Sequence, residues 1–250
     1  MSGQESGRQQ FVQFYSTSSY QCSYLDNQRA RSQVAITNEA VDRETYSQLI
    51  RHGFRRSGMF VYRPHCDLCR ACVPVRLVAN GFSPNRTQRK IWNRQSDMQV
   101  NIIRPVEKAE HYHLYQRYQK SRHAGGGMDE DGYDQYRSFL LKSPVDTWLV
   151  EFRKNGVLKI VSVIDMLDDG LSAVYTFFEP DEPEASYGVY TIMWQVQYLQ
   201  QIGKPYVYLG YWIENCRKMN YKSAYQPLEK LQDGVWHAWP KAEGTAPQPE

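Results

Sequence analysis

The spacing of apolar residues changes repeatedly along the first third of the chain and predicts several strands and one helix. Three segments alternate between apolar and polar positions, as half-buried strands do: residues 31–37, 59–63 and 73–78. Residues 42–52 have the period of a helix instead, with Asp42 as its N-terminal cap and Gly53 as its stop. We therefore predict a small α+β module over residues 12–80.

From residue 81 onward the pattern predicts a longer series of elements. The first helix begins at Pro84, with Ser83 as its cap. Three further helices are expected at residues 107–122, 132–142 and 187–202. Strands are expected at residues 98–104, 147–153, 157–166, 171–178, 206–211 and 235–239. We assign residues 81–240 to one domain and expect the polar ends, residues 1–10 and 241–250, to be flexible tails.

From residue 98 these elements follow the order β-α-α-β-β-β-α-β, which matches the fold of the GCN5-related N-acetyltransferases (GNATs). In that fold a splayed pair of central strands opens a cleft where an amine meets an activated acyl group. We therefore predict an α+β (mixed α/β) protein, with a GNAT-like acyltransferase domain after the small N-terminal module. The order alone does not identify the chemistry, because one fold serves many functions.

The segment that would bind coenzyme A does not have the residues that this requires. Acetyltransferases hold the coenzyme A pyrophosphate on backbone amides before the helix that follows the meander, in a glycine-rich loop led by Gln or Arg. The equivalent stretch here, residues 183–189, has one glycine, no basic leading residue and two acids nearby. We expect no coenzyme A and an acyl donor of another kind.

Four of the five cysteines lie between residues 22 and 72, within the predicted N-terminal module. Cys66, Cys69 and Cys72 follow one another at three-residue spacing, so one tight loop presents three soft ligands, and Cys22 could supply a fourth. The pattern predicts a zinc or iron–sulfur site, or the remnant of one. Thiols that stay free in a reducing cell are the alternative.

The composition is that of a soluble globular protein, with 23% charged residues and a formal net charge of only +3. An anionic partner must therefore meet a local cationic patch rather than the field of the whole molecule. No apolar stretch approaches the ~20 residues of a membrane span, and the first residues have no secretory signal pattern. Together with the odd number of cysteines, this predicts a cytoplasmic protein.

A set of short motifs spread over almost the whole globular part resembles one family. The motifs are Cys22-Ser23-Tyr24-Leu25, Gly53-Phe54-Arg55-Arg56-Ser57-Gly58, Tyr62-Arg63-Pro64-His65-Cys66, Arg122-His123, Tyr175-Thr176-Phe177-Phe178, Tyr208-Leu209-Gly210-Tyr211, Lys218-Met219-Asn220-Tyr221-Lys222 and Tyr225-Gln226-Pro227. They are similar to those of the bacterial aspartate/glutamate leucyltransferases, relatives of the eukaryotic arginyl-tRNA–protein transferases. Leu25 stands where the eukaryotic relatives have a second cysteine, so their cluster ligation does not transfer intact.

The resemblance implies transfer of leucine from leucyl-tRNA to the α-amine of proteins that begin with Asp or Glu, which marks them for degradation. An aminoacyl ester is already activated, so this chemistry requires no cofactor, ATP or coenzyme A. The attacking α-amine has an ordinary pKa of about 7.7–8.0, so only weak base assistance is needed. Two rival functions stay open: arginyl rather than leucyl transfer, and a non-catalytic cysteine-rich RNA-binding or sensor module.

Four cations are candidates for binding the acidic N-terminal residue of the acceptor. A guanidinium matches a carboxylate through two parallel hydrogen bonds, which favours Arg55 and Arg56. Lys218 and Lys222 follow a strand that would end at the cleft, and they could meet either the acceptor carboxylate or the tRNA. Each could instead belong to a solvated turn or loop.

Three residues are candidates for the catalytic step. Asp165 follows the apolar run 160–164 in a predicted core strand, where a carboxylate needs a partner or a task. We assign it as base or orienter of the amine, with a structural hydrogen-bonding role as the alternative. Tyr175 and Tyr211 should lie near the same cleft by strand order, although tyrosines more often serve in packing.

Six residues are candidates for binding tRNA. Arg86, Arg89, Lys90 and Arg94 recur at helical spacing, which would place four cations on one helix face. Such a face is also commonly just solvated. Arg122 and His123 close a helix, where they could grip the tRNA 3′ end or interact with the helix dipole.

Overall fold

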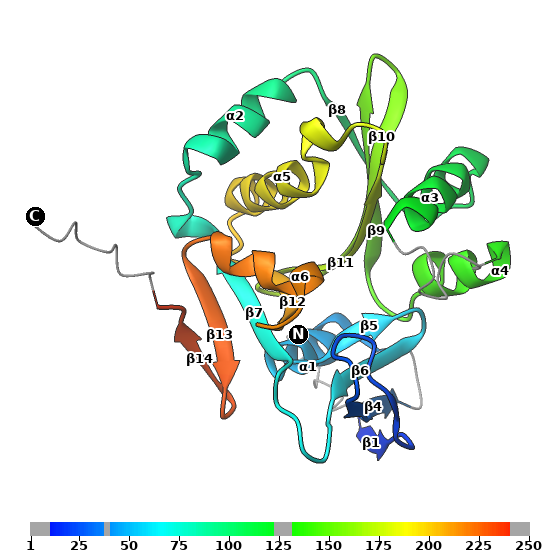
Figure 1. Cartoon of the computed structure of the whole chain (residues 1–250), viewed down its shortest axis with the longest axis vertical. Coiled ribbons are helices and arrows are strands. Elements are labelled where there is room, and N and C mark those ends of the chain that lie inside the picture. Colours follow the sequence, from blue (N-terminus) through cyan, green and yellow to red (C-terminus); the bar gives the residue numbers. More distant parts are fainter. Residues whose placement is uncertain (1–10, 38–40, 123–131, 241–250) are drawn as a thin grey trace, which may run out of the picture.

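The structure is a computed structural model, which describes residues 11–37, 41–122 and 132–240. The predicted tails, residues 1–10 and 241–250, lie outside the described residues, and so does His123. An eight-stranded sheet and a four-stranded sheet organise the chain (Figure 1). None of the described helices is both long and apolar enough to cross a membrane.

The large sheet contains eight strands from residues 73 to 238. Its strands are β7 (Val73–Val78), β8 (Gln99–Ile103), β9 (Thr147–Lys154), β10 (Val157–Met166), β11 (Gly170–Phe178), β12 (Tyr206–Trp212), β13 (Leu228–Gln232) and β14 (Val235–Ala238). They lie in the order β14-β13-β7-β12-β11-β10-β9-β8. The mixed α/β fold and the predicted order of elements, from β8 to β12, are confirmed.

Helices cover both faces of the large sheet (Figure 1). Helices α2 (Arg86–Arg94) and α5 (Tyr187–Gln201) pack together on one face. On the other face lie α3 (Ala109–Arg122), α4 (Tyr133–Tyr136) and the π-helical turn η3 (Arg137–Leu141). Strand β10 therefore has apolar side chains on both faces, which explains its nearly continuous apolar run.

The small sheet and helix α1 (Arg43–Arg51) form the N-terminal module. Its strands are β1 (Val12–Ser16), β4 (Ser32–Thr37), β5 (Arg55–Ser57) and β6 (Phe60–Pro64), in the order β1-β4-β6-β5. The Asp42 carboxylate accepts a hydrogen bond from the Thr45 N–H at 2.7 Å, and Gly53 has a φ of +84°. The predicted cap and stop of this helix are thus confirmed.

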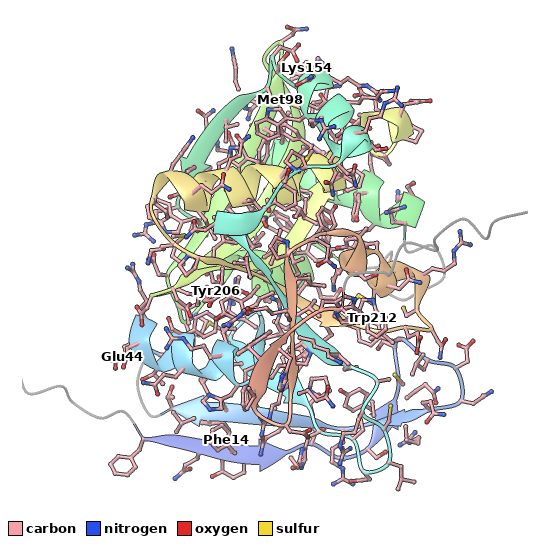
Figure 2. The ribbon with its side chains drawn as sticks, turned by 90° about the vertical axis from the view of Figure 1, so that its left-hand side faces the viewer. Phe14, Glu44, Met98, Lys154, Tyr206 and Trp212 are labelled. Carbon is pink, nitrogen blue, oxygen red and sulfur yellow. The ribbon has the colours of Figure 1, made fainter. Side chains whose placement is uncertain are left out.

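Shorter elements complete the described chain: the hairpin of β2 (Tyr20–Gln21) and β3 (Arg29–Ala30), the turns η1 (Ala79–Gly81), η4 (Pro183–Ala185) and η5 (Tyr221–Ala224), and helix α6 (Arg217–Asn220). A view from the side shows the small sheet with Phe14 at one end of the molecule and Met98 and Lys154 at the other (Figure 2). Tyr206, at the start of β12, lies between them.

The start of helix α2 and the sheet that contains strand β7 differ from the sequence-based predictions. Helix α2 begins at Arg86 rather than Pro84, because Asn85 and Gln88 form a reciprocal capping box. The Gln88 N–H donates to the Asn85 side chain at 2.9 Å, and the Asn85 N–H donates back to the Gln88 side chain at 2.8 Å. Strand β7, from the predicted 12–80 module, lies between β12 and β13 and so belongs to the eight-stranded sheet rather than the four-stranded one.

Strands β11 and β12 are the parallel pair at which the fold predicts a cleft. They pair only from Gly170 opposite Tyr206 to Ser172 opposite Tyr208. A glycine is required at the start of this pair, because a Cβ on Gly170 would lie 1.9 Å from the Tyr206 carbonyl oxygen. Beyond Ser172 no further pairing of these strands occurs in the described chain, so a gap opens between them.

Candidate active site

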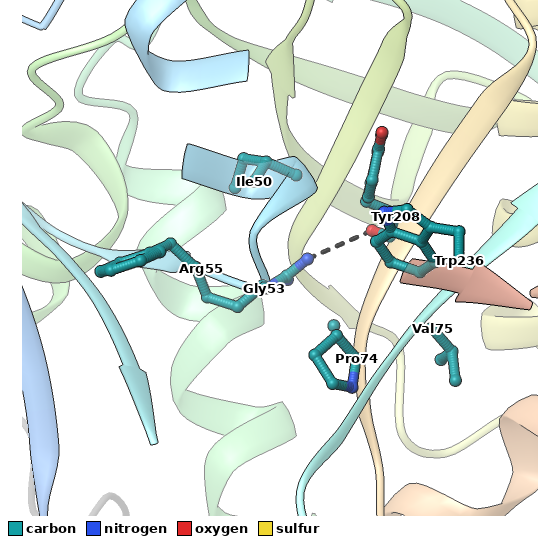
Figure 3. Close-up of a pocket in the computed structure, with 9 residues that line it drawn as sticks. Ile50, Gly53, Arg55, Pro74, Val75, Tyr208 and Trp236 are labelled. Carbon is teal, nitrogen blue, oxygen red and sulfur yellow. Dashed lines mark hydrogen bonds between the residues drawn. The ribbon is translucent and has the colours of Figure 1, made fainter. Parts of the chain in front are cut away.

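The guanidinium of Arg55 fills the gap where β11 and β12 separate. It donates to the Ser172 hydroxyl at 3.1 Å, to the Tyr208 carbonyl oxygen at 3.2 Å, and to the carbonyl oxygen of Ala173. The Arg55–Tyr208 bond is drawn in Figure 3. These contacts bridge the two separating strands, so a cation lies at the point where the sequence predicts the cleft to open.

Gly210 on β12 makes room for this guanidinium. Its φ is +79°, and a Cβ there would lie 3.1 Å from Cζ of Arg55. The pairing of β12 with β7 also shifts register between Tyr208 and Gly210. A bulge and a glycine at a functional cleft are a common way to redirect a strand. Sequence reasoning did not identify Gly210 as a site residue, although it lies in one of the family-like motifs.

A cavity of about 120 Å³ adjoins this cleft. The hairpin loop 22–28, strand β6 and the cysteine loop line it, and Tyr211 of β12 contributes from the large sheet. The cavity drawn in Figure 3, which Gly53 and Arg55 help to line, is only about 10 Å³ and holds at most about one water. The larger cavity is therefore the one that could admit part of a substrate.

Tyrosines surround this cavity and stay protonated. Tyr24 and Tyr62 line it, and burial raises the pKa of both phenols above the ordinary value. The Tyr211 hydroxyl donates to the Gly53 carbonyl oxygen at 2.8 Å, and burial raises the pKa of Tyr211 well above its usual value. At neutral pH these groups are neutral hydrogen-bonding walls rather than bases. Sequence reasoning did not single out Tyr24 or Tyr62.

The two candidate lysines lie in different environments. Lys218 is exposed on α6. Lys222 is only 5% exposed, and its Nζ donates to the Tyr211 carbonyl oxygen. Burial, followed by the nearby charge of Arg55, lowers the pKa of Lys222 to about 7, against opposing effects of Cys216 and Cys72. Near neutral pH, Lys222 therefore exists in both its charged and its neutral form.

Tyr175 lies in an aromatic cluster on the α3 face of the large sheet. Its hydroxyl donates to the Gln119 side-chain oxygen at 3.3 Å, and its ring packs edge-on against Phe139 with centroids 5.2 Å apart. Tyr211, by contrast, packs in a cluster with Ile213 and Cys216. The structure thus assigns the two tyrosines predicted for one cleft to separate clusters.

Arg56 and Asp165 form a fully buried ion pair. Both side chains are 0% exposed, and Nε and Nη2 of Arg56 donate to the two carboxylate oxygens at 2.8 and 2.9 Å. The Tyr46 hydroxyl donates to the same carboxylate at 2.7 Å, and the Thr147 hydroxyl donates to it as well. The predicted anomaly at Asp165 thus has its partners. Neither side chain has surface for a substrate, so the geometry favours the structural alternative for both.

The cations predicted to bind tRNA lie in two places. Arg86, Arg89, Lys90 and Arg94 are exposed on α2, which packs against α5 and not against the Arg55 cleft. Arg122, at the end of α3, lies 6.0 Å from the Phe178 ring centroid. The hydroxyl of Tyr221 is within electrostatic range of both Arg122 and Arg55. Of these cations, Arg122 is therefore the one that the structure brings towards the cleft.

All four N-terminal cysteines line the larger cavity and are half-buried. No disulfide joins the cysteines in the described chain. Burial and the neighbouring Cys22, Cys66 and Cys69 raise the pKa of the Cys72 thiol to about 12. The donor types fit zinc or an iron–sulfur cluster. However, the sulfur atoms of the cysteines do not form a group of three within 4.8 Å of one another in the described chain. The residues whose potential ligand atoms do so are Glu110, His111 and Glu151.

That second set is a network of charges rather than an open metal site. Lys108 donates to Glu151 at 2.5 Å, and Nε2 of the buried His111 lies 2.7 Å from the same oxygen. Arg153 pairs with both Glu110 and Glu151. Burial lowers the pKa of His111. Cations of the chain itself therefore already neutralise both carboxylates.

Comparison with known proteins identifies relatives over nearly the whole chain. Residues 20–90 match the N-terminal model, and residues 110–232 the C-terminal model, of the arginine-tRNA-protein transferases. An aspartate/glutamate leucyltransferase of Chromobacterium violaceum is 54% identical over 96% of this chain and 100% of the relative. That of Pseudomonas entomophila is 46% identical over 90% of this chain and 96% of the relative.

Solved structures resemble the chain more distantly. L-PGS from Bacillus licheniformis has a TM-score of 0.44 at 11% identity and covers 57% of this chain and 46% of its own. FemX has a TM-score of 0.43 at 6% identity and covers 80% of this chain and 79% of its own. The sequence relatives and the two matching models decide the assignment: the chain belongs to the arginine-tRNA-protein transferase family, with aspartate/glutamate leucyltransferases as relatives over 90% and 96% of its length.

Proposed function

We propose that this protein transfers leucine from leucyl-tRNA to the N-terminal α-amine of proteins that begin with Asp or Glu. The neutral amine attacks the ester carbonyl, an amide bond forms, and the ester bond to the terminal ribose breaks. Before the attack the α-ammonium gives up one proton to become the neutral amine. As the amide forms, the nitrogen loses a second proton, which passes to the ribose oxygen so that it leaves as a hydroxyl. The new N-terminal leucine would then act as a degradation signal, in the cytoplasm where aminoacyl-tRNA is made.

The observation that carries this proposal is the position of Arg55 at the separation of β11 and β12. Three of the five N–H groups of its guanidinium donate to Ser172, Ala173 and Tyr208 within the described structure. Two are therefore left for the carboxylate of an acidic first residue, with the guanidinium already oriented. Lys218, exposed on α6, could add a second positive charge at the rim.

Lys222 replaces Asp165 as our candidate for receiving the proton. Its pKa of about 7 lies just below that of an ordinary α-amine, about 7.7–8.0, so transfer of the proton between them is nearly balanced. Its Nζ is held by the Tyr211 carbonyl oxygen on the same strand that forms the cleft. Most of the rate enhancement is then expected from placing amine and ester together.

The donor tRNA is proposed to approach from the end of α3. Arg122 lies beside Phe178 of β11, and Tyr221 is within electrostatic range of both Arg122 and Arg55. Arg122 would therefore meet the 3′ end. The exposed cations of α2 could contact phosphates further along the tRNA.

For the N-terminal cysteines we propose a zinc or iron–sulfur site that orders the hairpin loop over the cavity and takes no part in the acyl transfer. Four thiols on one cavity support it. Elemental analysis of anaerobically purified protein tests it, since Cys69→Ser should lower metal content and thermal stability together. Protein without metal, with unchanged stability in the variant, would leave the free-thiol alternative.

One transfer assay tests the proposed function. The purified protein is incubated with radiolabelled leucyl-tRNA or arginyl-tRNA and with peptides that begin with Asp, Glu, Gln or Ala. Leucine should be incorporated into the Asp and Glu peptides only. Arginine incorporation would support the second candidate, which the match to arginine-tRNA-protein transferase models favours. Incorporation of neither amino acid would support a non-catalytic binding module.

A further inference from the structure

A row of four side chains crosses the small sheet from its edge strand to Arg55. Tyr15 of β1 lies opposite Val34 of β4, Val34 opposite Tyr62 of β6, and Tyr62 opposite Arg55 of β5. Directly opposed residues in antiparallel strands point to the same face. The row therefore forms a continuous path over the sheet that ends at the cation of the cleft.

The face that bears this row is mainly apolar and is open to solvent at its far side from Arg55, whereas Val34 and Tyr62 are half-buried. Ile36 lies two residues along β4 from Val34, and Phe60 two residues along β6 from Tyr62, so both share its face. Tyr15 is 54%, Ile36 47% and Phe60 68% exposed. Helix α1 packs against the opposite face, through Ala35 and Val61. We refer to this face as the outer face, and its apolar strand residues are Tyr15, Val34, Ile36, Phe60 and Tyr62.

The number of charged side chains on this face indicates which class of partner it fits. Among the described strand residues that point to it, Arg55 is the one charged side chain. Nucleic acid binding requires several cations that neutralise phosphates, and the outer face does not offer them. An extended polypeptide with one acidic end and apolar side chains after it is complementary to this arrangement. The acceptor of the transfer reaction must enter the cleft by its N-terminus, which is such an end.

We propose that the outer face binds the residues that follow the acidic first residue of the acceptor. This inference rests on the proposed function, because it takes Arg55 as the site of the first side chain. Three strand spacings of about 4.8 Å separate Arg55 from Tyr15, which makes about 14 Å. An extended chain rises about 3.3 Å per residue, so acceptor residues two to five would lie on the outer face.

The length of the acceptor tests the proposal. A series of peptides from two to eight residues begins with Glu-Ala and continues with Leu and Val, and a second series continues with Asp and Ser. The kcat/KM of the apolar series should rise about tenfold up to about five residues and then stay constant. The reason is that half-burying one leucine side chain strengthens binding by about that factor. The polar series should not rise. A flat apolar series, with normal transfer to the dipeptide, would overturn the proposal.

A double variant, Ile36→Ser with Phe60→Ser, locates the effect. It should abolish the rise with length while it leaves kcat/KM for the dipeptide and the KM for leucyl-tRNA unchanged. Val157→Ser is the matched control, because Val157 is a 56% exposed apolar residue on the large sheet. The control should retain the full rise. Since all three side chains are exposed, thermal unfolding should show that the variants fold normally.

Other occupants of the outer face would give different results. If the double variant retains the length dependence and raises the KM for leucyl-tRNA, the face binds the donor and the proposal is refuted. If it retains the length dependence and dissociates a dimer in sedimentation velocity, the face is an interface between two copies. Failure of leucine transfer to every peptide of both series by the unmodified protein would instead refute the proposed function. This outcome differs from a flat apolar series, so the two failures can be told apart.

Discussion

Replacing Asp165 should reduce the stability of the protein and leave the chemistry of its folded fraction largely intact. The carboxylate has no exposed surface, and Arg56, Tyr46 and Thr147 all donate to it. Asp165→Ala leaves the Arg56 guanidinium buried without a counterion. Such a change typically costs about 3–5 kcal/mol, because an uncompensated charge stays in a medium of low polarity.

The milder variant Asp165→Asn should lower the free energy of unfolding by a smaller amount. The amide oxygen of the new asparagine can still accept a hydrogen bond from Arg56 or Tyr46, but the negative charge is lost. The amide NH2 replaces the second carboxylate oxygen, so it faces groups that are themselves hydrogen-bond donors. A hydrogen bond to a charged group contributes about 1.5–3 kcal/mol, which is the expected loss of unfolding free energy. Asp97→Asn is the control, since Asp97 forms an ion pair with Lys154 with its side chain 49% exposed. That exposed pair should contribute less than about 1 kcal/mol.

Equilibrium urea unfolding measures the stabilities, and initial rates of leucine transfer are normalised to the folded fraction. We expect kcat of both Asp165 variants within about threefold of the unmodified protein. If Asp165 is instead the catalytic base, kcat should fall by about 10²–10⁴ at unchanged stability. That result would refute the structural role argued here and restore the prediction from the sequence.

Further predictions concern the cleft and the donor. Arg55→Ala should lower kcat/KM for Glu-initiated peptides by about ten- to a hundredfold and remove the discrimination against Gln, since one charge-assisted contact is lost; unchanged discrimination would place the carboxylate elsewhere. If Lys222 receives the proton, the transfer rate should rise with pH through about 7 as the Lys222 side chain becomes neutral. Lys222→Arg should abolish this inflection because arginine does not lose its proton. A variant that keeps the inflection would argue against Lys222 as the base. The same pKa predicts that burial of Lys222 costs stability fully below pH about 7 and progressively less as pH rises to 10.5, which pH-dependent unfolding can check. Gly210→Ala should cost about 1–2 kcal/mol through its positive φ and displace Arg55, so normal acceptor kinetics in that variant would argue against the role of Gly210. Changing the four cations of α2 to glutamine should flatten the salt dependence of leucyl-tRNA binding, and an equal log–log slope would place the tRNA on other cations such as Arg122.

Local patterns of the sequence predicted most elements of the fold. The period of residues 42–52, a capping Asp42 and a terminal Gly53 were sufficient to define α1, because each signal acts within one helical turn. Alternation defined β7 over its full observed length, Val73–Val78. The start of α2 was predicted too early because two possible capping residues, Ser83 and Asn85, lie close together. Asn85 is the residue that caps the helix, through its reciprocal hydrogen bonds with Gln88.

The candidate site could be predicted only in part, because it depends on contacts between distant segments. Asp165 was recognised as an anomaly from its own strand, but its partner Arg56 lies 109 residues away, and local patterns do not define that contact. The same limit applies to Lys222. Its position in the chain indicated a cleft residue, but its altered pKa follows from burial and from Arg55, which only the folded arrangement brings near.

Arg55 and Arg56 show how one short strand can join assembly to recognition. Successive residues of a strand point to opposite faces, so the two guanidinium groups must point apart. Arg56 forms the buried pair with Asp165 of β10, while Arg55 donates to Ser172 and Ala173 of β11. The pair that docks the small sheet against the large one thereby also fixes the backbone that carries Arg55. A change at Arg56 should consequently affect acceptor recognition through position, even though Arg56 itself has no surface for a substrate.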